Sequence, residues 1–245
     1  MMVLLAICFL VGTLIGITGI GGILLIPSLA VFGGLETHAA MATALASFLA
    51  GGVVGTYRYW RMGYMHWRTA FPVAAGGLLF AYVGAWVNAG LPVRPLDTML
   101  GLLIIFAGVS AFKSWTAGSF CAVGHRLEMP VLLFIGASTG FLAGLTGAGG
   151  PVLSIPFMIV AGFAPVLSVA VAMPYQIMTA FSGTVGNLLH GTVDFGLIVP
   201  ITIVQVLGVY LGSRLAPHIP AARLKTMIGL VCLGVGGFVL VRAWL

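Results

Sequence analysis

The chain has 245 residues, of which 61% are hydrophobic and only 6% are charged, and its mean hydropathy is +1.20. Since a soluble domain carries roughly 25% charged residues, this composition excludes a soluble globular protein and indicates an integral membrane protein. The net charge of +6 comes from ten Lys and Arg scattered between apolar segments, a pattern that sets membrane topology and does not predict a nucleic-acid partner. The apolar runs lack the alternation of barrel strands, so the expected fold class is all-α within a lipid bilayer.

The first uncharged segment, residues 1–35, is too long for one membrane span. A continuous helix of this length would measure about 52 Å, whereas the hydrocarbon core is about 30 Å thick and two spans need about 40 residues. The segment contains the sequence GITGIGGILLIP at 16–27. Because glycine frees the backbone, we predict two half-helices that meet at residues 18–22, where the backbone must be buried in protein or line a cavity.

Three further spans complete the first half, at about residues 36–57, 69–93 and 95–115. A basic cluster follows the first of them, and prolines at 92 and 95 mark the turn before the last. The next residues form the only extended polar connection in the chain. We therefore predict a first transmembrane repeat at 1–117, a connecting loop at 118–129 and a second repeat at 130–245.

The second half repeats the first. Residues 129–163 are again uncharged and contain GLTGAGGPVLSIP at 144–156, so a second break is expected at 146–150. Spans follow at about 164–189, 195–215 and 221–244. Similar residues recur 128 positions apart: Gly16 and Gly144, Thr18 and Thr146, Tyr82 and Tyr210, Gly84 and Gly212, Pro92 and Pro220, Met99 and Met227, Gly101 and Gly229. This recurrence indicates an internal duplication.

The basic residues discriminate between two topologies. Four crossings in each half would place six Lys and Arg on one side and four on the other. If the first segment of each half instead enters and leaves by the same face, eight share a side and only Arg94 and Arg242 lie opposite. Because Lys and Arg concentrate in cytoplasmic loops, we predict inverted repeats, each with a broken or re-entrant first helix and three spanning helices, and both termini outside the cytoplasm.

In this arrangement the two breaks approach the middle of the bilayer from opposite faces, and each exposes the N-terminus of its returning half-helix. Unpaired N–H groups and the positive end of a helix dipole favour an anion. We therefore predict that the breaks bind a small anionic substrate, through Thr18, Gly19, Gly21, Gly22, Thr146, Gly147, Gly149 and Gly150. Other glycines spaced by four are expected to serve close helix packing: Gly12, Gly16, Gly136, Gly140 and Gly144.

Polar residues in the following spans are candidates to complete the site. Ser47, Tyr175 and Gln176 are included among the predicted substrate-binding residues, and Thr43, Ser182 and Asn187 are further candidates. Each can instead bond to a neighbouring helix, since such hydrogen bonds are common and worth only about 0.6 to 2 kcal/mol.

The four acids, Glu36, Asp97, Glu128 and Asp194, lie near predicted span ends and none is paired at a catalytic spacing. This argues against an intramembrane hydrolase, and neither a cofactor nor a metal site is expected. His190 and Asp194 are four residues apart at a predicted loop, where a solvated pair is the commoner outcome.

The repeated GxGG followed five or six residues later by proline, the glycine-rich spans, and the sequences GYMHWR and GTVDFG together resemble the sulfite exporter TauE/SafE family. The resemblance covers essentially the whole chain, although many members carry a third consecutive glycine where this chain has Ile23 and Pro151. It implies a small protein of the bacterial cytoplasmic (inner) membrane that moves sulfite, sulfonates or other sulfur-containing organic anions, mostly outward. The matching residues are Gly19, Gly21, Gly22 and Pro27, with Gly147, Gly149, Gly150 and Pro156.

Two alternatives remain open at the level of sequence. One is a transporter of another small organic anion. The other is a membrane scaffold or assembly factor that transports nothing, because small-residue packing faces would serve it equally well. The oligomeric state is also open, a homo-oligomer included.

Overall fold

The computed structural model describes residues 2–19, 21–112, 125–161, 163, 165–190, 193–215 and 221–244. These residues form helices joined by short turns, and five of the helices are long and apolar enough to cross a membrane. The five are α3 (Thr37–Arg61), α4 (Trp67–Gly90), α8 (Pro165–His190), α9 (Phe195–Leu215) and the part Met129–Thr146 of α6 (His125–Thr146). Helices α5 (Val93–Phe112) and α10 (Ala221–Trp244) pack against each other at one side of the bundle. The predicted all-α membrane fold is confirmed.

The first segment of each half is broken at the predicted glycines. Helix α1 (Met2–Thr18) stops at Thr18, and the chain continues as the 3-10 turn η1 (Gly21–Leu24) and α2 (Leu25–Phe32). In the second half α6 stops at Thr146 and α7 (Pro151–Val160) follows. Pro151 occupies the first helical position of α7, where its missing N–H costs no hydrogen bond.

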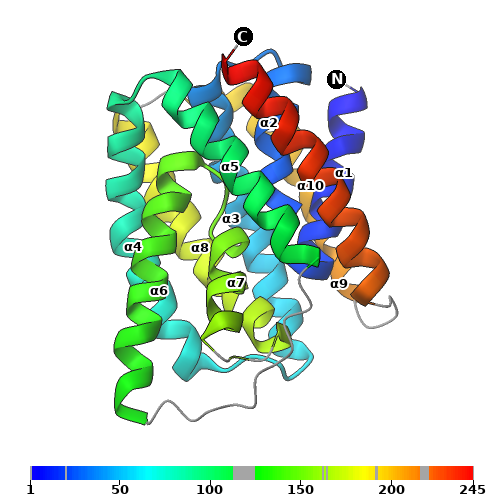
Figure 1. Cartoon of the computed structure of the whole chain (residues 1–245). Coiled ribbons are helices and arrows are strands. Elements are labelled where there is room, and N and C mark those ends of the chain that lie inside the picture. Colours follow the sequence, from blue (N-terminus) through cyan, green and yellow to red (C-terminus); the bar gives the residue numbers. More distant parts are fainter. Residues whose placement is uncertain are drawn as a thin grey trace.

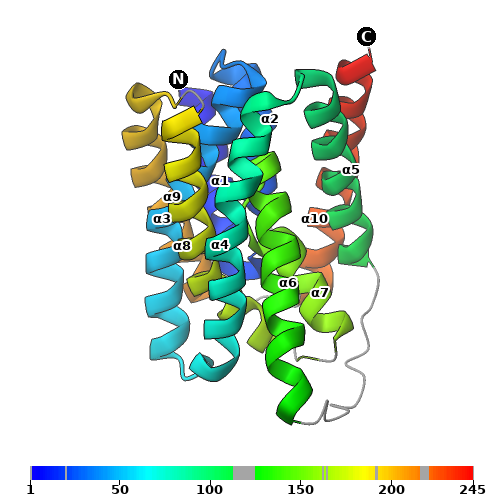
Figure 2. The same cartoon turned by 90° about the vertical axis from the view of Figure 1, so that its left-hand side faces the viewer.

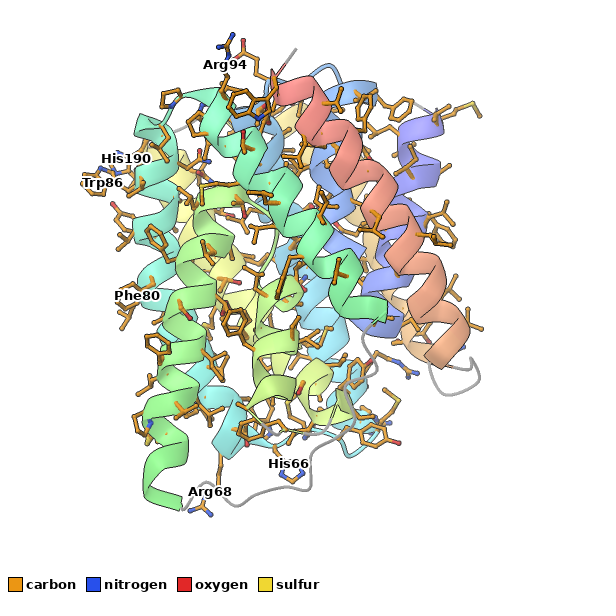
Figure 3. All side chains as sticks on the ribbon, viewed as in Figure 1. His66, Arg68, Phe80, Trp86, Arg94 and His190 are labelled. Carbon is orange, nitrogen blue, oxygen red and sulfur yellow. The ribbon has the colours of Figure 1, made fainter. Side chains whose placement is uncertain are left out.

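The broken segments are hairpins that open toward opposite ends of the bundle. Arg94 and Arg68 lie at these two ends, which we call the Arg94 end and the Arg68 end (Figure 3). Helix α1 starts at the Arg94 end and α2 returns to it, whereas α6 starts at the Arg68 end and α7 runs back toward that end (Figures 1 and 2). The start of α1 and the end of α10 both lie at the Arg94 end (Figure 1).

Glycine seams hold each hairpin against the opposite half. A β-carbon added at Gly16 on α1 would lie 2.8 Å from the Ser213 nitrogen on α9, and one added at Gly140 on α6 would lie 2.7 Å from the Gly77 Cα on α4. Backbones this close leave no room for larger side chains. The packing role expected for these glycines is therefore confirmed.

The two seams use equivalent positions. Gly12 and Gly16 of α1 face Gln205 and Val209 of α9, and Gly140 and Gly144 of α6 face Gly77 and Ala81 of α4. The residues of the two seams pair at a separation of 128 positions: Gly12 with Gly140, Gly16 with Gly144, Gly77 with Gln205, and Ala81 with Val209. The outer helix of each hairpin thus packs against the third segment of the other half, in the same way in both halves.

The connection between the halves differs from the sequence prediction in extent. Residues 113–124, which contain Lys113 and most of the predicted loop, lie outside the described residues, and α6 already begins at His125. The predicted polar connection therefore ends in helix, because the residues before Pro130 extend the first turns of α6.

Candidate functional site

Glycines in the left-handed region turn the chain at both breaks. Gly19 has a φ of 76°, and in the second break Gly147 and Gly149 have φ values of 66° and 76°. Residues with a β-carbon rarely adopt this conformation, so both breaks depend on glycine for their backbone path. Gly21, the counterpart of Gly149, instead begins the 3-10 turn, and the two breaks are therefore similar but not identical.

The two breaks come together at the side chain of Phe48, on α3. A β-carbon at Gly22 would lie 3.1 Å from Phe48 Cζ, and one at Gly149 would lie 3.2 Å from the same ring. Gly19 faces the second hairpin directly, since its β-carbon would lie 3.7 Å from Pro151 Cβ. All these residues are buried, so the breaks meet inside the protein at one aromatic ring.

Helix α8 supplies the other wall through two of the predicted site residues. Nε2 of Gln176 donates a hydrogen bond of 2.9 Å to the carbonyl of Phe48, and the ring of Tyr175 covers Gly150. The Tyr175 hydroxyl lies 2.6 Å from Oγ1 of Thr139, which itself donates to the Ile135 carbonyl. Because the threonine proton is already committed, Tyr175 is the donor in this pair.

The predicted hydroxyl ligands are engaged within their own helices. Thr18 donates to the Leu14 carbonyl at 2.9 Å, Thr146 to the Leu142 carbonyl at 2.7 Å and Ser47 to the Ala44 carbonyl at 2.7 Å. A hydroxyl has a single proton, so in this conformation none of the three offers a donor to an anion. The structure thus brings the predicted glycines together with Tyr175 and Gln176, while the three hydroxyls face helix carbonyls.

Free hydrogen-bond donors are found instead at the start of α7. The N–H groups of Gly149, Gly150 and Val152 have no hydrogen-bond partner within the described ranges. Ser154, in the first turn of α7, is fully buried, and its hydroxyl has no partner there either. A buried donor without a partner costs about 1–3 kcal/mol, so a bound group that accepts these hydrogen bonds would be favoured.

Sequence reasoning missed Ser154 and two amide side chains. Gln205 on α9 is fully buried, and neither atom of its amide has a partner among the residues described. Asn88 on α4 donates to the Leu145 carbonyl at 2.6 Å and so holds the last turn of α6 beside the second break. The available signal was an amide inside an otherwise uncharged span, the same signal that singled out Gln176.

The remaining polar candidates connect helices away from Phe48. Thr43 accepts a hydrogen bond from the Asp194 backbone, and Ser182 donates to the Leu78 carbonyl. Asp194 caps the start of α9 by accepting from the N–H groups of residues 196 and 197, while Nε2 of His190 lies 3.2 Å from the Tyr82 hydroxyl. His190 and Asp194 therefore have separate structural partners. Asn187 is buried in α8.

Two opposed helical hairpins within a bundle of spanning helices, with helix breaks that meet in its interior, are typical of multi-pass membrane transporters. The comparison with known families is more specific. The family model described as "Sulfite exporter TauE/SafE" matches residues 4–239. The chain belongs to the sulfite exporter TauE/SafE family.

Related proteins match along nearly their full length. The "Probable membrane transporter protein YdhB" of Bacillus subtilis (strain 168) is 25% identical over 232 residues, which cover 93% of this chain and 95% of that protein. A "Probable membrane transporter protein" of Xylella fastidiosa (strain 9a5c) is 25% identical over 244 residues, covering 96% and 93%. The "Probable membrane transporter protein MJ0441" of Methanocaldococcus jannaschii is 23% identical over 250 residues, which cover 93% of this chain and 92% of that protein. Family and relatives agree on membrane transport.

Proposed function

We propose that this protein exports a small sulfur-containing anion, sulfite or an organosulfonate, across the cytoplasmic (inner) membrane. The anion is held between the two glycine breaks. The proposal rests on the hydrogen-bond donors at the start of α7 that have no partner among the described residues and lie next to Gly19 of the first hairpin. N–H groups and a hydroxyl at the positive end of a helix dipole bind an anion without a costly buried cation.

The substrate class rests on the family and on charge. Glu36 and Asp194 directly precede α3 and α9, and Asp97 lies near the start of α5, so these three acids lie at the Arg94 end and away from the breaks. A tetrahedral or pyramidal oxyanion presents several acceptor oxygens, which match donors that converge from a helix start. Sulfite and sulfonates have this form.

The two halves act as inverted repeats in this proposal. The opposite openings of the hairpins and the equivalent glycine seams support that relation. So does charge: Arg58, Arg61, Arg68 and Arg214 occupy helix ends at the Arg68 end, which the positive-inside rule assigns to the cytoplasm. Transport then requires each hairpin in turn to move away from Phe48, so that the breaks open to one side at a time.

Flux measurements in proteoliposomes test the proposal. The purified protein is reconstituted, and uptake of sulfite, sulfoacetate, sulfate and a carboxylate such as acetate is compared with uptake by empty vesicles. We expect saturable flux of sulfite or sulfoacetate above the background. Flux of the carboxylate alone would assign another organic anion as the substrate, and no flux of any anion would favour a membrane scaffold.

A further inference from the structure

Helices α1, α3 and α9 meet beside the last turn of α1, directly before the first glycine break. The Tyr59 hydroxyl on α3 donates to the Gly16 carbonyl at 3.4 Å, and Gly16 packs against the backbone of Ser213 on α9. Tyr59 and Ser213 are buried. The side chain that precedes Tyr59, Arg58, therefore lies next to the end of α1, shortly before the chain turns at Gly19.

Arg58 is held in place by neutral groups. Its Nε donates to the Ser213 hydroxyl at 3.2 Å, and its guanidinium carbon lies 5.4 Å from the centre of the Tyr210 ring. A second cation shares this ring, since the guanidinium carbon of Arg214 lies 4.7 Å from the same centre. The terminal amino groups of Arg58 have no hydrogen-bond partner in the part of the chain that the structure describes.

No described acid neutralises these two arginines. The carboxylates whose side chains are described, Glu36, Asp97 and Asp194, all lie toward the Arg94 end. Two like charges at one ring repel each other, and an anion between them would remove the repulsion. A guanidinium also presents paired N–H groups that match two oxygens of an oxyanion.

The positive-inside rule alone does not account for this arrangement. Arg61 and Arg68 are exposed at the same end, as topological arginines are expected to be. Arg58 is half-buried instead, and its orientation is fixed by Ser213 and Tyr210. Among the described residues Arg58 is thus a partly buried cation with unused donors and no counter-ion, an arrangement that is typical of an anion site.

We propose that Arg58 and Arg214, around the ring of Tyr210, form an oxyanion-binding site at the mouth of the transport path, beside the last turn of α1 and next to the first glycine break. This inference rests on the proposed anion transport: the site receives the sulfite or sulfonate group before it reaches the breaks. The chemistry of the ligand is a sulfur or phosphorus oxyanion, carried either by the free substrate or by the headgroup of an anionic lipid.

The test compares Arg58→Gln with Arg61→Gln, which removes the same charge from the same helix end at an exposed position. Uptake of radiolabelled sulfite is measured against concentration in vesicles of phosphatidylcholine and in vesicles that also contain phosphatidylglycerol. We expect Arg58→Gln to raise KM about tenfold, because it removes one charge-assisted hydrogen bond to the anion. Arg61→Gln should leave KM within about twofold of the value for the unmodified protein. Arg214 is exposed, so Arg214→Gln should not disturb folding. We expect this variant to raise KM about threefold, because an exposed charge contributes less binding energy than a partly buried one.

The comparison of the two vesicle compositions shows whether the oxyanion belongs to the free substrate or to a lipid. A difference between Arg58→Gln and Arg61→Gln in pure phosphatidylcholine assigns the free substrate, and a difference only with phosphatidylglycerol assigns the lipid headgroup. Equal KM values for the two variants in both vesicles would overturn the site. Absence of sulfite flux in the unmodified protein would instead refute the proposed function, so the two failures are distinguishable.

Discussion

Single glycines determine the backbone path at the proposed site for two separate reasons. At Gly149 a side chain would be strained by the positive φ and would also press on the ring of Phe48. At Gly21 the φ is not positive, but a β-carbon would lie 2.6 Å from Leu14 Cβ within the same hairpin. Substitution therefore displaces the break in either case, by strain and contact in one hairpin and by contact alone in the other.

We predict that Gly149→Leu and Gly21→Leu each abolish sulfite flux while the protein still inserts in the membrane. Gly63→Leu is the matched control, because Gly63 has a φ of 78° but has no atom within 4 Å of its would-be β-carbon. The Gly63→Leu variant therefore has the backbone strain of about 1–2 kcal/mol but no steric clash with a neighbouring residue. Flux in proteoliposomes and elution as a monodisperse species in detergent measure the two properties. Normal transport by both leucine variants would reduce the breaks to packing elements.

Ser154 allows a gentler test at the same scale. Because its buried hydroxyl has no partner among the described residues, Ser154→Ala should leave thermal stability unchanged or slightly raised. If the hydroxyl donates to the anion, KM for sulfite should rise about two- to tenfold, the equivalent of one neutral hydrogen bond. Ser138→Ala serves as the control, since the Ser138 hydroxyl donates to the Phe134 carbonyl of its own helix. An unchanged KM for Ser154→Ala would remove this residue from the site.

At the scale of elements, the glycine seams decide how closely the hairpins approach the opposite half. Gly140 and Gly77 allow the backbones of α6 and α4 to touch, as Gly12 and Gly16 do for α1 on α9. Lipid provides no hydrophobic force between helices, so this close van der Waals contact supplies much of the association. The seams thereby join the outer helix of each hairpin to the opposite half.

Gly140→Leu should separate α6 from α4 and lower the free energy of unfolding by about 1–3 kcal/mol, as expected for overpacking. Gly234→Leu is the control, because Gly234 on α10 has no atom within 4 Å of its would-be β-carbon. Thermal unfolding in detergent compares the two variants, followed by the fluorescence of a thiol-reactive dye at buried Cys8 in a background in which Cys121 and Cys232 are replaced by serine. A loss of stability in Gly234→Leu as large as in Gly140→Leu would contradict the role of the seam.

The sequence predicted the helices and both breaks, because length and apolarity constrain them strongly. The predicted breaks at 18–22 and 146–150 coincide with the interruptions after Thr18 and Thr146. Contacts between residues on different helices could not be predicted from the sequence, however. Phe48 was one apolar residue among many, and the binding of Asn88 to Leu145 depends on how α4 crosses α6. The engagement of the Thr18 and Thr146 hydroxyls could not be predicted either, since a threonine in a helix can bond back to its own turn or face a ligand.

At the scale of the whole molecule, the inverted arrangement makes a topological prediction. Cysteines introduced at Gly63 and at Gly191, in variants without the native cysteines, should react with a membrane-impermeant maleimide from opposite faces. Gly63 follows α3 at the Arg68 end, and residue 191 follows α8, which ends at the Arg94 end. Gly191 itself lies outside the described residues. Labelling of both cysteines from the same face would contradict the inverted relation of the halves.

The position of Phe48 also bears on the energetics of the membrane that holds the protein. In the described conformation its ring contacts both breaks, and residues 21–24 and 143–150 are buried, so their backbone polar groups are closed off from water at either end. Each hairpin turns at its glycine break inside the bundle, and the ring of Phe48 fills the space between the two breaks. We therefore expect the protein in this conformation to conduct no ions, so that vesicles containing it should hold a membrane potential as well as empty vesicles do.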